Sequence, residues 1–201
     1  LRRSPVGGAG APPAGGGRIV QAEISGKLIH GIQWENGAIS VVQTGFAPVF
    51  DAQGKRSIGA KINVLGSFAP LGEKPALALT RADQNGSITC VRLLSGQRLA
   101  LSKLSTQEDL FGEKTTTQKD LLITEGVPAN ISALALDQAG RYLYAGTASG
   151  SLVRWDLGTL EKVRVLDSLE AAPEGRAITA LNLVLGDISL AVGTQNGELS
   201  T

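Results

Sequence analysis

Short apolar runs separated by turn residues recur along the chain, and the stretch from Ile131 to Leu157 shows this pattern most clearly. Its leucine, tyrosine and valine residues alternate with smaller or polar neighbours, and Gly140 and Gly150 interrupt them at short intervals. Alternation with a period of two between glycine-containing turns predicts a meander of antiparallel strands. We find no convincing amphipathic helix in the remainder of the sequence.

The same pattern predicts further strands from Arg18 onward. They are expected at Arg18–Ile24, Lys27–Trp34, Ala38–Gln43, Phe46–Phe50, Ile58–Leu65, Ala76–Arg81, Ser87–Leu93, Gln97–Leu104, Asp120–Thr124, Glu161–Leu166, Ile178–Val184 and Ile188–Val192, with another beginning at Glu198. The polar segment 105–119 is predicted to be a loop insertion, and 167–176 a loop. Residues 1–17 are rich in Gly, Pro and Ala, which predicts a flexible linker ahead of a folded domain at 18–201.

An internal repeat links the opening stretch to the end of the chain. A shift of 47 residues places Ile131–Leu152 on Ile178–Leu199 without a gap, and it aligns Gly150 with Gly197. The hairpin motif at these glycines also occurs at Asn36-Gly37 and Asn85-Gly86. Asn-Gly between apolar runs predicts a type I′ turn with positive φ at both central residues. A second echo relates Asp51–Lys55 to Asp137–Arg141.

A four-stranded unit repeated every 40 to 50 residues is the period of a β-propeller blade. We therefore predict an all-β, β-propeller-like fold with about four blades of four antiparallel strands, as part of a larger propeller. The last blade ends inside its third strand. The opening stretch resembles a WD-repeat blade through Trp155-Asp156, but no Gly-His pair precedes it, so the His-containing network of that family is not expected.

Composition narrows the function classes. The 201 residues carry a net charge of +1 without a basic stripe, and aromatic residues make up only 4%, which argues against nucleic-acid binding. A single cysteine excludes an intrachain disulfide. The chain contains no methionine, so we expect it to be an internal piece of a longer protein. No apolar run is long enough to span a membrane as a helix.

The search for chemistry is mostly negative. His30 is the only histidine and lies in an apolar strand, where a structural or surface role is the usual one. Cys90 lies between Thr89 and Val91, with no basic residue placed to activate the thiol. One histidine and one cysteine cannot form an ordinary zinc site. We therefore assign no catalytic, cofactor-binding or metal-binding residue and expect no enzyme activity.

A few further residues are candidates for minor roles. The carboxylate pairs Glu108-Asp109 and Glu170 with Glu174 lie in polar segments and are expected to be solvated. Trp155 is expected to anchor blade packing, and Tyr142 and Tyr144 to share one face of a strand. The remaining feature is Leu110-Phe111 inside the polar insertion, which makes 105–119 the best candidate for a recognition loop.

One resemblance is more specific than the blade. The segment ITALNLVLGDISLAVGTQNGEL, Ile178–Leu199, resembles part of the large soluble insert of certain bacterial phosphate ABC-transporter permeases. The preceding LSKLSTQEDLFGEKTTTQKDLLIT and ISALALDQAGRYLYAG occur in the same order, so the resemblance covers roughly Leu99–Leu199. In that family a domain with WD-like repeats follows the first transmembrane helix. The first half of the chain fits in kind, without a residue-by-residue match.

The resemblance implies a periplasmic domain of an inner-membrane phosphate permease, with a non-catalytic role in assembly or regulation of phosphate import. The implied partners are a second permease, an ATPase and a phosphate-binding protein, with membrane attachment through segments outside residues 1–201. The resemblance carries no transport residue over to this sequence. A cytoplasmic WD-like scaffold for protein partners is the alternative, and an enzyme with its site in a propeller funnel is the least favoured, because ionisable groups are sparse.

Overall fold

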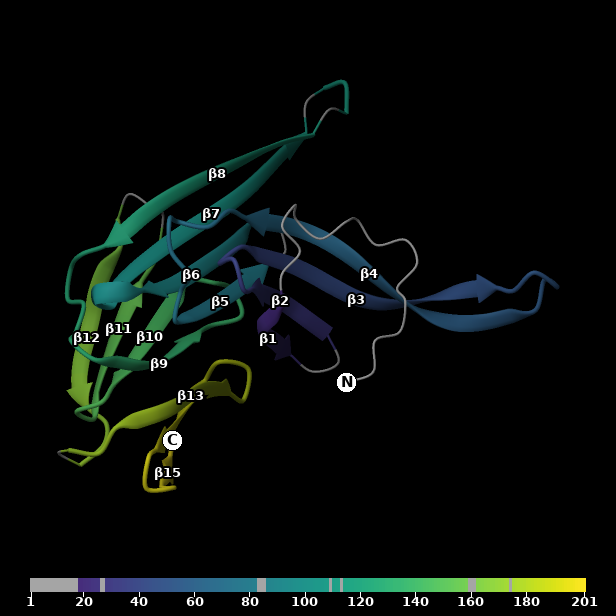
Figure 1. The fold of residues 1–201 in the computed structure, drawn as a ribbon. Helices are drawn as coiled ribbons and strands as arrows, with labels where there is room; N and C mark the ends of the chain where they lie inside the picture. Colours follow the sequence, from purple (N-terminus) through teal and green to yellow (C-terminus); the bar gives the residue numbers. More distant parts are fainter. Residues whose placement is uncertain are drawn as a thin grey trace. The chain divides into compact units, whose positions relative to one another are not determined.

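In the computed structural model the described residues are 18–25, 28–82, 86–108, 110–112, 114–158, 162–173 and 175–201. Apart from one turn of 3-10 helix, η1 (Ser95–Gln97), their regular elements are all strands (Figure 1). The prediction of an all-β fold is confirmed. The predicted linker, residues 1–17, lies outside the described residues.

The strands form four small antiparallel sheets in which sequence neighbours pair, as in propeller blades. The first sheet contains β1 (Ile19–Ser25), β2 (Leu28–Trp34), β3 (Ile39–Phe50) and β4 (Arg56–Phe68), and the second β5 (Leu77–Ala82), β6 (Ile88–Leu94), β7 (Arg98–Glu108) and β8 (Lys114–Ile123). The third contains β9 (Ile131–Leu136), β10 (Tyr142–Thr147), β11 (Ser151–Asp156) and β12 (Arg164–Glu170), and the fourth β13 (Ile178–Val184), β14 (Ser189–Thr194) and β15 (Leu199–Ser200). Three of these sheets have four strands and the fourth has three, and the prediction of about four propeller-like blades is confirmed.

The chain divides into two compact units, one ending at Lys74 and the other beginning at Pro75. Within the second unit, successive sheets bury apolar faces against each other. One core cluster joins the second and third sheets and includes Leu99, Leu143 and Trp155. A smaller one joins the third and fourth and includes Leu152 and Ile178. A small sheet with two apolar faces needs such neighbours, because alone it cannot remove both faces from water.

The 47-residue repeat is preserved in the hydrogen bonds. The backbone amide of Ala148 donates to the Asn130 carbonyl at 2.9 Å, and the equivalent amide of Gln195 donates to the Ala177 carbonyl at 2.9 Å. In both copies the turn glycine donates back across the turn, Gly150 to Thr147 and Gly197 to Thr194. The third and fourth sheets are therefore two copies of one structural unit.

The hairpin turns differ from the predicted type. Only the glycines have positive φ, at 84° for Gly37, 96° for Gly150 and 81° for Gly197, whereas Asn36 and Asn196 do not. A tight turn followed by a glycine in the left-handed region is the three-residue hairpin with a G1 bulge, rather than type I′. Asn-Gly is compatible with both turn types, so strand alignment makes the choice.

The second repeated motif, Asp51–Lys55 and Asp137–Arg141, also forms the same local structure in both places. The Gly54 amide donates to the Asp51 carbonyl at 2.9 Å, and the Gly140 amide donates to the Asp137 carbonyl at 3.0 Å. In each turn one carboxylate oxygen of the aspartate accepts two backbone amides from residues that follow it. Aspartate begins these turns because its short side chain can satisfy amides that the hairpin leaves unpaired.

The segment 105–119 is a hairpin for most of its length, which corrects the predicted loop insertion. β7 and β8 remain paired from Leu99↔Ile123 out to Glu108↔Lys114. The Thr106 and Thr116 hydroxyl oxygens lie 3.0 Å apart across the pair. Polar β-branched residues form strands readily when their side chains face water, which a search for apolar alternation does not detect.

Several strands extend past their predicted limits. β3 continues through Thr44 and Gly45 without a break, β8 begins six residues before Asp120, and β12 extends beyond Leu166 to Glu170. Each extension pairs with a neighbouring strand of the same sheet. The partner strand supplies the hydrogen bonds, so polar residues continue the ladder after the apolar alternation has ended.

Candidate functional site

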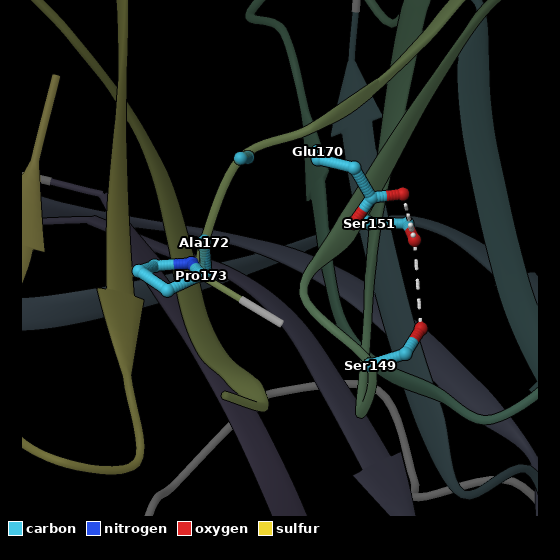
Figure 2. A pocket seen from close by; sticks show the side chains of 6 residues that line it. Ser149, Ser151, Glu170, Ala172 and Pro173 are labelled. Carbon is cyan, nitrogen blue, oxygen red and sulfur yellow. Dashed lines mark hydrogen bonds between the residues drawn. The ribbon is translucent and has the colours of Figure 1, made fainter. Parts of the chain in front are cut away.

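A depression in the second unit lies where the β10–β11 turn meets the connection that follows β12. Its volume is about 650 Å³, and Figure 2 shows the side chains around it. The lining residues are Ser149, Ser151, Glu170, Ala171, Ala172 and Pro173. The turn supplies Ser149, the start of β11 supplies Ser151, and the end of β12 supplies the carboxylate of Glu170.

A chain of hydroxyl groups leads to the carboxylate. The Thr147 and Ser149 hydroxyl oxygens are 3.0 Å apart, and those of Ser149 and Ser151 are 3.4 Å apart. Ser151 Oγ donates to Glu170 Oε1 at 2.9 Å, as the dashed line between these residues in Figure 2 shows. Ser151 and Glu170 meet because they lie directly opposite each other in the register of the β11–β12 pair.

Gly150 fastens this turn to the connection between the third and fourth sheets. Its carbonyl oxygen accepts the backbone amides of Ala171 and Ala172, both at 3.0 Å. A Cβ placed on Gly150 would lie 2.8 Å from the Ala172 carbonyl oxygen and 3.2 Å from that of Arg176. With φ at 96°, the position is suited to glycine for two independent reasons.

The lining defines what the depression can bind. The described residues that line it offer hydroxyl groups and one carboxylate, and none of these described residues is histidine, lysine or arginine. A serine nucleophile needs a neighbouring base and an anion-stabilising site. Among the described lining residues, Glu170 is the one carboxylate, and none carries a cationic side chain that would stabilise an anion. Glu170 would also repel a phosphate group. The arrangement suits polar, uncharged or cationic groups such as those of a protein surface.

The residues singled out in the sequence lie on different strands. His30 lies in β2, and its side chain is outside the described part. Cys90 is completely buried in β6. Trp155 is fully buried in the core between the second and third sheets, which confirms its predicted packing role. Its Nε1 donates to the Glu125 carbonyl oxygen at 2.9 Å. Tyr144 packs against the smaller core cluster.

The predicted carboxylate pairs have different outcomes. Glu170 lies in the depression, whereas its predicted companion Glu174 lies outside the described residues. Asp109 also lies outside the described residues, and nothing is described of the Glu108 side chain. Leu110 and Phe111 are fully exposed at the end of the β7–β8 hairpin, as a recognition loop would require.

A charged cluster that the sequence reasoning missed surrounds Asp156. Arg141 Nη2 lies 3.1 Å from Asp156 Oδ2, and Arg164 Nη2 lies 3.8 Å from it. The hydrogen bond from Arg141 lowers the pKa of the Asp156 carboxyl, against the effect of desolvation, and the Gly158 amide adds to the lowering. The Trp155-Asp156 dipeptide was noted in the sequence, but its ion pairs were not predicted. Asp156 connects the end of β11 to the guanidinium groups of Arg141 and Arg164.

A buried arginine is the second feature that was missed. Arg92 in β6 is fully buried, and its Nη2 donates to Ser102 Oγ at 2.5 Å. Ser102 Oγ donates in turn to Asp120 Oδ1 at 2.5 Å, and Arg92 Nη2 lies 3.8 Å from the same oxygen. The three residues come from three adjacent strands. A buried charge needs such partners, and the sequence signal is one arginine inside an apolar run.

Within the described ranges, no group of three or more His, Cys, Asp or Glu side chains could hold a metal ion. No helix in the same ranges is long and apolar enough to cross a membrane. No protein-family model matches the chain, and no curated protein shows significant similarity to it.

Proposed function

We propose that the chain is a soluble extracytoplasmic domain of a phosphate ABC-transporter permease. In this role it takes part in inorganic phosphate import across the bacterial inner membrane, and it assists assembly or regulation without catalysing a step. The observation that carries the proposal is the resemblance of Leu99–Leu199 to the soluble insert of such permeases.

The propeller-like fold is of the type expected for such an insert. The resembling stretch contains the β7–β8 hairpin, the whole third sheet and the repeat of its first strands in the fourth. WD-like blades are the repeats expected of that insert. Stacked blades present rigid surfaces on which loops can hold a partner. The proposed partners are the second permease, the ATPase and the phosphate-binding protein, with the membrane reached through segments outside residues 1–201.

The site chemistry is compatible with a part that does not itself bind the transported ion. The depression at the β10–β11 turn carries Glu170 and two serines, and none of its described lining residues has a cationic side chain. A phosphate site uses arginine, lysine or a cluster of backbone amides. Titration of the purified chain with inorganic phosphate should therefore give no saturable signal. A saturable signal would require a phosphate site that the proposal does not contain.

The first experiment concerns the flanking gene sequence. The proposal expects an apolar segment of about 20 residues upstream and several downstream, as a permease requires. The second experiment measures uptake of radiolabelled phosphate in the source bacterium after in-frame removal of the codons for residues 18–201. Uptake under phosphate limitation should fall while the permease remains present on an immunoblot. Unchanged uptake, or wholly soluble flanks, would refute the proposal.

The alternative function is a cytoplasmic WD-like scaffold for protein partners. The exposed Leu110 and Phe111 at the hairpin end favour a protein-binding role in either location. Fusion of alkaline phosphatase after Thr201 of the full-length protein distinguishes the two, because this enzyme is active only after export. High activity supports the transporter domain, and low activity with normal protein levels supports the scaffold.

A further inference from the structure

The first unit contains a two-stranded arm, residues Thr44–Ile62, that runs out beyond its sheet (Figure 1). In the described pairing, β2 reaches β3 at Ile39 and Ser40, whereas β3 and β4 continue together to Phe50 and Arg56. Beyond its base the arm is therefore a two-stranded ribbon. Such a hairpin is marginally stable in water by itself, so the sequence of its exposed face indicates what stabilises it.

One face of the arm is apolar. Residues directly opposite each other in an antiparallel pair share a face, and here the pairs are Pro48 with Ile58 and Phe50 with Arg56. Phe46 lies on the same face two residues before Pro48. The exposed fractions are 79% for Phe46, 62% for Phe50 and 74% for Ile58. A contiguous exposed patch of two aromatic rings and a branched chain marks an interaction surface.

The charge of the arm indicates the partner. From Thr44 to Ile62 the sequence has three basic residues, Lys55, Arg56 and Lys61, against the single acid Asp51, although the whole chain is only +1. Asp51 is engaged inside the turn, where Oδ1 accepts the amides of Gln53 at 3.0 Å and Lys55 at 2.8 Å. Lys55 and Arg56 therefore place positive charge at the end of the arm, and Arg56 lies on the same face as Phe50 and Ile58.

We infer that the arm lies on an anionic lipid surface, with Phe46, Phe50 and Ile58 in the headgroup boundary and Lys55 and Arg56 against lipid phosphates. Aromatic and aliphatic side chains on one face, flanked by basic residues, are what interfacial segments use. Arg56 can keep its guanidinium at the headgroups while its methylene groups cover Phe50. A second copy of the chain is a poorer occupant, because packing this face on itself would bring the Arg56 side chains together.

The test is co-sedimentation of the full chain with vesicles of phosphatidylcholine alone and of phosphatidylcholine mixed with phosphatidylglycerol. The chain should bind the anionic vesicles and not the neutral ones, and added salt should weaken binding. The double variant Phe46→Ser/Phe50→Ser should lose about tenfold or more in partition coefficient. The double variant Lys55→Gln/Arg56→Gln should lose about fivefold for each residue changed.

A matched control removes two apolar residues that are equally exposed elsewhere. Ile188 is 84% exposed and Leu199 is 75% exposed, and both belong to the fourth sheet or its turn. The variant Ile188→Ser/Leu199→Ser should bind vesicles as the unchanged chain does. Circular dichroism spectra should be superimposable for all variants, because each changed side chain faces water.

Three results would overturn the inference. They are equal binding to neutral and anionic vesicles, no binding to either, and unchanged binding of the Phe46→Ser/Phe50→Ser variant. A dimer that forms without vesicles and is lost in that variant would assign the face to a second copy instead. This inference does not depend on the transporter proposal, because lipid binding by the arm and phosphate uptake by the cell are measured separately.

Discussion

Gly146 of β10 packs directly against Ile178 of β13, so closely that a Cβ on Gly146 would lie 2.5 Å from Ile178 Cγ2. The added Cβ would also lie 2.9 Å from Ile178 Cβ, and that atom can be displaced only if the Ile178 backbone moves with it. Ile178 is itself fully buried in the cluster that joins the third and fourth sheets. The third and fourth sheets can therefore approach this closely only because residue 146 has no side chain.

The substitution Gly146→Ala should destabilise the protein by about 1–3 kcal/mol, because the added methyl group overpacks this contact. Denaturant unfolding followed by circular dichroism measures the change. Gly45→Ala is the matched control, since Gly45 is also in a strand and has nothing within 4 Å of its Cβ position. That control should be neutral or slightly stabilising. Equal losses in both variants would contradict the packing argument.

A second prediction separates the ring of Trp155 from its hydrogen bond. Trp155→Phe retains most of the buried ring but removes the donor to the Glu125 carbonyl, and it should cost about 1–3 kcal/mol. Trp155→Ala removes the ring as well, and it should cost about 3–5 kcal/mol. Unfolding free energies of the two variants give the comparison. If both variants lost the same amount, the ring would add nothing to blade stacking.

The carbonyl groups around Gly150 give a third prediction. Gly150→Ala should cost about 3 kcal/mol or more, because it combines a left-handed conformation with an approach to the Ala172 carbonyl. Gly197 is the equivalent glycine of the next blade, has φ of 81° and has nothing within 4 Å. Gly197→Ala should therefore cost only about 1–2 kcal/mol of conformational strain. The difference between the two thermal midpoints measures the contribution of the carbonyl contacts.

The fourth prediction concerns acid stability. The hydrogen bond from Arg141 lowers the pKa of Asp156 in the folded state below its unfolded value of about 3.9. The carboxylate therefore stabilises the fold above that unfolded value, and the contribution is lost as the pH falls through the lower, folded pKa. Between neutral pH and about pH 2, the unfolding free energy should fall more steeply for the unchanged chain than for Asp156→Asn. Parallel pH profiles would rule out this linkage.

The differences between predicted and observed strands have a common cause. Apolar alternation marks the part of a strand that is buried, and strands such as β8 and β12 continue past it with polar residues. Threonine-rich and charged stretches pair because a neighbouring strand offers hydrogen bonds, and a single sequence does not display its neighbour. The turn type was mispredicted for the same reason. Asn-Gly is compatible with a type I′ turn and with a three-residue G1-bulge hairpin, and these two differ in how the flanking strands are aligned.

The site was less predictable than the fold. Glu170 reaches Ser151 because register places them opposite each other across β11 and β12. Arg92 reaches Asp120 across three strands in the same way. Each residue is ordinary in its local sequence, so local pattern alone could not join them. The apolar face of the β3–β4 arm likewise depends on which residue of one strand lies opposite which residue of the other.

The sequence by itself determined the all-β class, the blade as the repeating unit and the positions of the turn glycines. It could do so because strand alternation and left-handed glycine conformations are properties of a few consecutive residues. The tertiary structure alone decided which hydroxyl meets which carboxylate, how closely the blades approach at Gly146, and that Phe46, Phe50 and Ile58 face water. These features arise from contacts between residues distant in the chain, whose register follows from the packing of whole sheets.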